Sequence, residues 1–250
     1  MKRIIRIFLL VLLVTIFVTS NMYLYKELNE ERKQEIVFEE LSNIVEETEI
    51  KEENNKINIQ KLYEENNDFV GWLKIEDTNI NYPIMQTEIE RKDYYLKRNF
   101  YKEYSSLGTP YIAEYCNILN SDNVIIYGHH ITKNKMFGEL ENYKNKEFYE
   151  NHKIINFNTI YGEINYEIIS VFKTIDYEED TFKYYDFVKA ENKEEYYNFI
   201  NKCEELSLYE TEKTARYGDK LLTLSTCEYS NKNGRLVIVA KMINSNVVGK

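Results

Sequence analysis

The sequence predicts a mainly β domain, either an antiparallel sandwich or a barrel, preceded by one membrane-spanning helix. Short runs rich in β-branched and aromatic residues alternate with turn signals, which is typical of such β folds. An apolar run long enough to cross a bilayer lies at the N-terminus. The 250 residues, with 43% hydrophobic content, are enough for one sizeable domain and its appendages.

The first segment, residues 1–25, is predicted to be a signal anchor. Three basic residues and no acidic one accompany an apolar stretch from Ile7 to about Leu24. A helix of about 20 residues spans a bilayer core, and roughly 17 suffice. Basic residues ahead of the span predict a single-pass protein with a cytoplasmic N-terminus and the domain outside the cell membrane. A cleaved signal peptide is the alternative, although residues 19–22 make a poor cleavage site.

The second segment, residues 26–56, is strongly acidic but contains an apolar helical face. Four apolar residues are spaced i, i+4, i+7 and i+8, namely Val37, Leu41, Ile44 and Val45. This spacing predicts an amphipathic helix that packs on the domain. Residues 46–56 would then be a solvated connector. The alternative is a charged stalk that only separates the domain from the membrane.

The third segment, residues 57–246, is predicted to be the folded domain. A short helix precedes Gly71 and the only tryptophan, and a strand follows. Further strands are expected at residues 80–86, 108–116, 123–129, 153–160, 164–175, 220–227 and 235–243. One helix interrupts them at 191–206, with Cys203 on its apolar face.

Composition argues against several classes of function. The formal net charge is −10, so the acidic domain has no electrostatic footprint for nucleic acid. The three cysteines and three histidines lack the spacing of a zinc site, and we expect neither a metal nor a cofactor. An odd number of cysteines leaves at least one free thiol.

Cys227 is the cysteine whose neighbours suggest chemistry. It ends the predicted strand 220–227, and a polar turn leads to Arg235 at the start of the next strand. In a hairpin the two would lie side by side, and an adjacent fixed cation favours a thiolate. A structural role fits this stretch equally well, because hairpins often flank their turns with arginine. Cys203 is expected to be buried, and Cys116 has no activating neighbour.

A nucleophilic thiol also needs an imidazole. His129 and His130 follow Gly128 at the end of a predicted strand, and adjacent residues point to opposite sides. One of them can therefore enter a groove beside the strand end. His152 is expected to make a structural hydrogen bond. Spacing alone does not choose among the three.

Several of these stretches together resemble the sortases, which are cysteine transpeptidases that attach proteins to the Gram-positive cell wall. The general resemblance lies in TLSTC (223–227), GRLVIVAK (234–241) and IYGHHI (126–131). Class B is resembled in particular by VGWLKIEDTNINYPIMQ (70–86), DYYLKRNF (93–100), MFGEL (136–140) and the helix at 191–206. The resemblance covers roughly residues 57–243.

The resemblance implies a closed eight-stranded β-barrel with N-terminal helices and a helix in the connection before the cysteine strand. It implies Cys227 as the nucleophile, His129 as the acid and base, and Arg235 as the essential arginine. The substrates would be surface proteins with a C-terminal sorting motif. An amine of peptidoglycan or its precursor would accept the acyl group.

Three neighbours of the matched motifs, Tyr127, Ser225 and Glu228, are predicted to form the groove wall. The backbone N–H of Glu228 is a candidate oxyanion donor. Two other classes remain open. A membrane-anchored cysteine endopeptidase would use the same residues and pass the acyl group to water, whereas a non-catalytic surface binding domain would not need the thiol.

Overall fold

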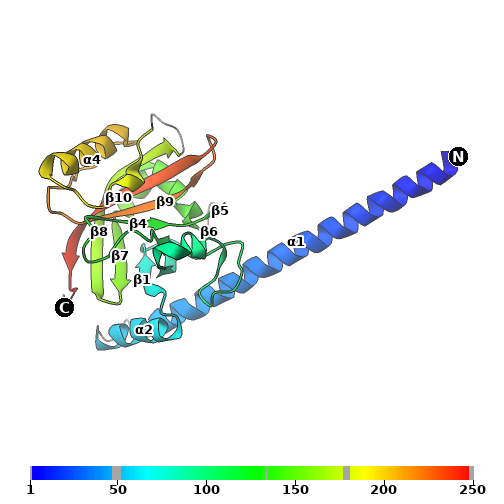
Figure 1. Cartoon of the computed structure of the whole chain (residues 1–250), viewed down its shortest axis with the longest axis horizontal. Coiled ribbons are helices and arrows are strands. Elements are labelled where there is room, and N and C mark those ends of the chain that lie inside the picture. The colour runs from blue at the N-terminus through cyan, green and yellow to red at the C-terminus, as the bar shows by residue number, and fades with distance from the viewer. Residues whose placement is uncertain (1, 47–51, 133–134, 177–180, 248–250) are drawn as a thin grey trace.

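The computed structural model describes residues 2–46, 52–132, 135–176 and 181–247. Figure 1 shows a β-barrel with helices around it and one long helix that projects away from it. The predicted mainly β fold is confirmed. Of the two architectures expected from the strand pattern, a sandwich or a barrel, the structure has the closed barrel.

Eight strands close the barrel in the order β1-β2-β3-β4-β9-β10-β8-β7, as the resemblance implied. Their bounds are Phe69–Lys74 (β1), Asn81–Met85 (β2), Tyr111–Ile112 (β3), Asn123–Tyr127 (β4), Ile154–Thr159 (β7), Gly162–Ile175 (β8), Leu221–Glu228 (β9) and Gly234–Ser245 (β10). Neighbours are antiparallel except β2 with β3 and β4 with β9, which are parallel. Closure leaves no long unpaired edge in the barrel.

Short elements connect these strands. They are the two-stranded sheet β5 (His130–Thr132) and β6 (Lys135–Met136), the 3-10 helices η1 (Ile89–Arg91), η2 (Tyr94–Lys97), η3 (Phe137–Lys144) and η4 (Tyr184–Asp186), and the helices α3 (Lys146–Asn151) and α4 (Lys193–Leu206). The helix expected from residue 191 begins two residues later. The Asn192 side chain caps it by accepting a hydrogen bond from the Glu195 N–H.

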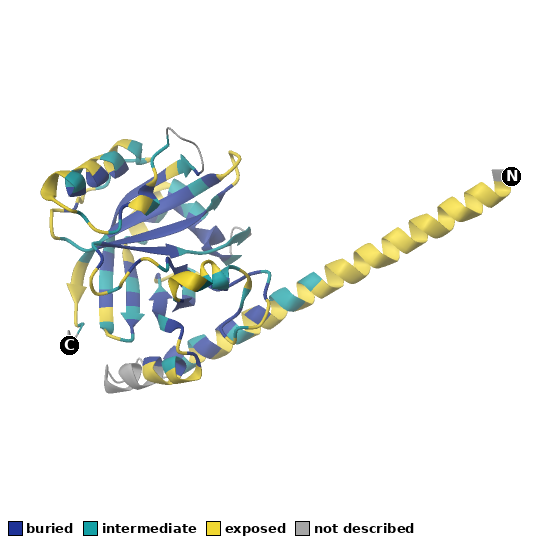
Figure 2. Ribbon diagram, viewed as in Figure 1, coloured by how far each residue is buried: buried dark blue, intermediate teal, exposed yellow. Residues whose placement is uncertain are grey.

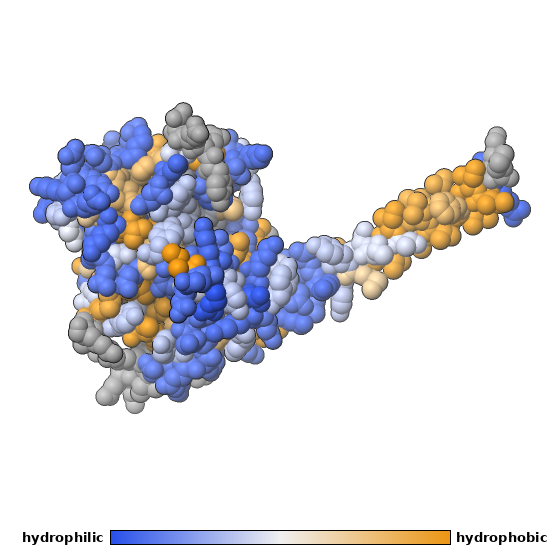
Figure 3. Space-filling model, in the orientation of Figure 1, coloured by the Kyte–Doolittle hydropathy of each residue, from blue (hydrophilic) through white to orange (hydrophobic). Residues whose placement is uncertain are grey.

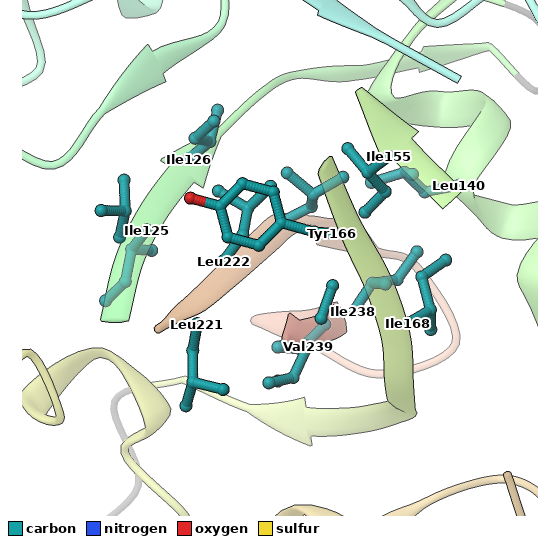
Figure 4. Close-up of a cluster of buried hydrophobic side chains, with 14 of the residues drawn as sticks. Ile125, Ile126, Leu140, Ile155, Tyr166, Ile168, Leu221, Leu222, Ile238 and Val239 are labelled. Atoms are coloured by element: carbon teal, nitrogen blue, oxygen red, sulfur yellow. The ribbon is translucent and has the colours of Figure 1, made fainter. Parts of the chain in front are cut away.

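Successive residues of a strand face opposite sides, and in β4 and β9 nearly every residue is buried, so apolar side chains pack on both faces of these strands. Figure 4 shows a cluster of buried hydrophobic side chains, in which residues from β4, β7, β8, β9 and β10 take part. Ile125, Leu222 and Ile238 are among its fully buried members. Each such side chain contributes roughly 1.5–3 kcal/mol on burial, so this cluster provides a rigid frame for the strand ends.

Two helices precede the barrel, α1 (Lys2–Glu46) and α2 (Glu52–Glu65). The predicted amphipathic face does pack on the domain: Leu41 and Val45 are buried, and Val37 and Ile44 lie against the same cluster. This part of α1 is therefore more than a charged stalk (Figure 2). Of the expected connector, residues 47–51 lie outside the described residues, and residues 52–56 belong to α2.

The N-terminal part of α1 extends beyond the domain as an apolar rod, as Figure 3 shows. In the described part of the chain, one helix is long and apolar enough to cross a membrane. It is this one, with a mean hydropathy of 2.3 in its most apolar 18-residue stretch and none of that stretch buried.

Candidate active site

A groove of about 700 Å³ opens beside the ends of β4, β9 and β10. The parallel pairing of β4 with β9 sets Tyr127 beside Ser225, so the residues that follow also emerge together. His129 and Cys227 both line the groove, and Arg235 reaches it from β10. The topology thus brings His129 to Cys227 and Arg235, which lie about a hundred positions further along the chain.

Cys227 and Arg235 face each other in the ladder between β9 and β10. Arg235 Nη1 donates a hydrogen bond to Cys227 Sγ at 3.2 Å, and its Nη2 lies 3.2 Å from Asp176 Oδ2. The hairpin inferred from the sequence therefore does place the guanidinium at the thiol. A guanidinium held at both ends can stabilise negative charge on the sulfur or on an oxygen bound nearby.

Asp176 was not singled out in the sequence. It lies just after β8 and is nearly buried, and the β8–β10 register pairs Thr174 with Arg235. That register brings the carboxylate to the arginine. One sequence does not reveal a register between strands sixty residues apart.

His129 lies in the same groove, half buried, with its Nε2 2.7 Å from the main-chain oxygen of Leu96 in η2. A carbonyl oxygen only accepts, so Nε2 carries the proton and Nδ1 is the nitrogen left for proton transfer. Burial lowers the pKa of His129 below its usual 6.5, and the charge of Lys97 lowers it further, although the bond to Leu96 acts in the opposite direction. A main-chain acceptor leaves no sequence signature.

Gly128 fixes the chain just before His129. Its N–H donates to the Ser225 carbonyl at 3.1 Å, and its own carbonyl accepts from Thr226 Oγ1 at 2.8 Å. A Cβ at this position would lie 2.5 Å from Cγ of Phe137, so the aromatic ring requires a residue without a side chain. The glycine thus holds the histidine segment against β9.

The other two histidines lie elsewhere. His130 is not among the groove-lining residues, and its Nδ1 is 2.8 Å from the main-chain oxygen of Cys227. The expectation that only one of the two adjacent histidines enters the groove is confirmed. His152 bonds the Phe148 carbonyl at 2.7 Å and stacks on its ring, as expected of a structural histidine.

The remaining two thiols are buried and lie outside this groove. Burial raises the pKa of Cys203 well above its usual value and that of Cys116 to about 11. Cys227 is the partly exposed thiol, and all three cysteines are free. Within the described ranges, no group of three or more His, Cys, Asp or Glu side chains is arranged to hold a metal ion.

Of the predicted wall residues, Tyr127 and Ser225 do line the groove. Glu228 does not, because successive strand residues face opposite sides and Cys227 faces the groove. Its buried carboxylate accepts hydrogen bonds from Lys144 and Ser230. Burial alone would raise the pKa of Glu228, but these partners outweigh it and lower the pKa to about 2.

Most of the remaining groove lining comes from residues that were not predicted as site residues. They are Lys92, Asp93, Leu96, Tyr111, Glu114, Tyr115, Asp176, Tyr184, Tyr185, Asp186 and Val188. Aromatic rings with a few polar groups suit an extended peptide, whose main chain needs donors and whose side chains need apolar contact. Two of these residues, Asp93 and Leu96, lie in the stretch DYYLKRNF (93–100) that carries part of the class B resemblance.

Comparison with known proteins gives consistent matches. The family model for the sortase domain matches residues 73–243. Sortase B of Staphylococcus aureus is 35% identical over 187 residues, which are 74% of each chain. Sortase B of Listeria monocytogenes is 34% identical over 189 residues, 74% of this chain and 72% of the other.

Solved structures agree with these matches. A Staphylococcus aureus sortase B–substrate complex superposes with a TM-score of 0.77 at 31% identity and covers 86% of this chain and 98% of its own. Sortase B from Bacillus anthracis in complex with AAEK1 gives 0.73 at 31% identity, with 87% and 99% covered. With the family model covering most of the barrel and two relatives above 30% identity, the chain belongs to the sortase family of cysteine transpeptidases, in class B.

Proposed function

We propose that this protein is a membrane-anchored sortase that cleaves a sorting motif in surface proteins and transfers the acyl group to a peptidoglycan amine. The observation that carries the proposal is the thiol of Cys227, 3.2 Å from Arg235 Nη1, in a groove that His129 also lines. That the Staphylococcus aureus relative was solved as a complex with its substrate supports a substrate-binding role for this fold.

In the first step, the Cys227 thiolate attacks the carbonyl carbon of a threonine in the motif. A C–S bond forms, and the carbonyl oxygen takes the negative charge, which Arg235 stabilises. The C–N bond then breaks as the His129 imidazolium gives its proton to the leaving amine. Because burial lowers the pKa of His129, its imidazolium is a stronger acid than free histidine. The product is a thioester on Cys227.

In the second step, an amine attacks the thioester carbonyl. Neutral His129 accepts a proton from that amine, the new C–N bond forms, and the C–S bond breaks to restore the thiolate. One amide bond is exchanged for another, so no oxidant or nucleotide is required. If water took the place of the amine, the same residues would act as an endopeptidase.

The apolar part of α1 supports a single membrane span with the catalytic domain outside the cell. Surface proteins and the amine of the cell wall lie on that side. The membrane anchor would therefore hold the groove at the outer face of the membrane, where the surface proteins are cleaved and transferred.

The test uses the full-length protein in detergent with a library of sorting-motif peptides and a peptidoglycan-like amine, followed by mass spectrometry. We expect a thioester on Cys227 and an amide-linked product. Cys227→Ala should abolish both, whereas Cys116→Ala and Cys203→Ala should retain them. Hydrolysed peptide without amide product would favour the endopeptidase. No cleavage of any peptide would favour a binding domain.

A further inference from the structure

Two hydrogen bonds outside the groove join the segment that carries the imidazole to the segment that carries the thiol. His130 Nδ1 lies 2.8 Å from the Cys227 carbonyl oxygen, and Tyr229 Oη donates to the His130 carbonyl at 2.8 Å. The rings of His130 and Tyr229 lie 4.7 Å apart at 59°. We name these two side chains and the two carbonyls the clasp.

The clasp continues the pairing of β4 with β9 after the barrel ladder has ended. That ladder ends at Tyr127 and Ser225, and β5 pairs with β6 in a separate sheet. The contact from His130 lies directly after His129 and fixes the peptide unit of Cys227 itself. It therefore joins the main chain of Cys227 to the residue next to His129.

Burial does not explain why these residues are arranged in this way. Tyr229 is 70% exposed, so its ring contributes little to the apolar core. His130 is partly buried, and Glu141 lies 3.9 Å from the same Nδ1 while also pairing with Lys144 at 2.7 Å. Both residues instead make specific hydrogen bonds to the main chain: His130 to the Cys227 carbonyl and Tyr229 to the His130 carbonyl.

The chemistry of the contact fixes its direction. A carbonyl oxygen has no proton to give, so the His130 nitrogen facing Cys227 must be Nδ1–H. In the neutral ring, that bond selects the Nδ1–H tautomer. An asparagine would place its amide N–H close to the same point, whereas a glutamine would place it nearer the position of Nε2.

We propose that His130 and Tyr229 are positioning residues that hold the Cys227 thiol and the His129 imidazole at the separation the acyl transfer requires. This inference rests on the proposed function, because the separation matters only if both groups react. A displacement of about 1 Å in such a pair can cost up to roughly a hundredfold in rate.

The kinetic test compares four variants of the full-length protein in the thioester and transfer assay. We expect His130→Ala and His130→Gln to lose on the order of 10- to 100-fold in kcat with little change in KM. His130→Asn should retain activity within several-fold of the parent, and Tyr229→Phe should lose several-fold. Parental kcat in His130→Ala would overturn the proposal, as would equal losses in the Asn and Gln variants.

His152→Ala is the matched control. It removes a histidine whose Nδ1 also lies beside a main-chain carbonyl and whose ring also contacts another ring, but at a site outside the groove. We expect parental kcat and KM. A loss equal to that of His130→Ala would mean that both changes act through general stability, which would overturn the clasp.

A measurement independent of activity separates the clasp from the proposed function. The nitrogen shifts of the His130 ring, assigned by NMR with His130→Asn as reference, should show the Nδ1–H tautomer in the resting enzyme. The Nε2–H tautomer would overturn the clasp even in an active transpeptidase. Conversely, a parent enzyme that forms no thioester would overturn the proposed function. The NMR measurement of the His130 tautomer would still show whether the hydrogen bond to the Cys227 carbonyl exists.

Discussion

Arg235 is held at both ends of its guanidinium group. One terminal nitrogen donates to the Cys227 sulfur, and the other lies against the Asp176 carboxylate, each at 3.2 Å. This arrangement fixes a planar fork of donors beside the Cys227 sulfur. A lysine would bring the charge without the fork.

Arg235→Lys therefore tests whether geometry or charge matters. Removing one oxyanion donor in other enzymes costs about 10²–10³-fold in rate, and we expect a loss on the order of 10²-fold in kcat/KM. Alkylation of Cys227 by iodoacetamide should stay within several-fold of the parent rate. Near-parental turnover would show that charge alone suffices. A matching collapse of alkylation would make the arginine an activator of the thiol.

The charge of Lys97 contributes to the lowered pKa of His129, after the larger effect of burial. Lys97→Gln removes that charge, so the pKa of His129 should rise toward 6.5. An NMR titration of the imidazole protons measures it, and exposed Lys146→Gln, for which we expect no change, serves as the control. A pKa that stays the same or falls in Lys97→Gln would contradict the electrostatic account.

At the scale of elements, the end of β9 is anchored to η3 by an ion pair. The buried Glu228 carboxylate bonds Lys144, which also pairs with Glu141. The anchor lies on the opposite side of the strand from the Cys227 thiol, so it holds the end of β9 from the side that faces away from the groove. Strand alternation, which turns the Cys227 side chain to the groove, turns the Glu228 side chain to this ion pair.

This anchor predicts an acid-sensitive contribution to folding. The pKa of Glu228 is about 2 in the folded protein against 4.5 ordinarily, so the carboxylate stabilises the fold above about pH 4.5. That contribution is lost as pH falls from 4.5 towards 2. Between pH 5 and 3, urea midpoints of the parent should fall more steeply than those of Glu228→Gln. Equal slopes would show that the ion pair contributes nothing.

The sequence patterns located the strands and helices more accurately than they indicated which residues come into contact in the fold. The alternating runs located the barrel strands, and the turn between β9 and β10 was enough to pair Cys227 with Arg235. The strand expected at residues 108–116 shrinks to Tyr111–Ile112, because a turn follows directly, with the Cys116 N–H bonded to the Ala113 carbonyl. The Leu96 carbonyl and Asp176 were missed, because both reach the site through tertiary pairing that one sequence does not encode visibly.

At the scale of the whole molecule, the proposed topology places the barrel outside the cell. Protease added to intact, wall-stripped cells should then digest the domain and leave a fragment close to the size of the membrane anchor. Immunoblots with an N-terminal tag measure the fragment, and a cytoplasmic protein serves as the control for intact cells. Full protection of the domain would contradict the topology and the cell-wall role.

The long helix α1 runs without a break from the apolar segment to its contacts with the domain, where Glu31 pairs with Lys135 and Gln34 donates to the Gly108 carbonyl. With the apolar segment in a bilayer, this continuous helix would connect the domain to the membrane rigidly and not as a flexible linker. At about 1.5 Å per residue, the roughly seven residues from the end of the apolar stretch at Leu24 to the contact at Glu31 set the domain about 10 Å along the axis from the span. Each residue added or removed would also turn the barrel by about 100°. The length of the helix thus sets both the distance of the groove from the membrane and the direction in which the groove opens. Under the proposed function, a substrate must present its cleavage site at that distance.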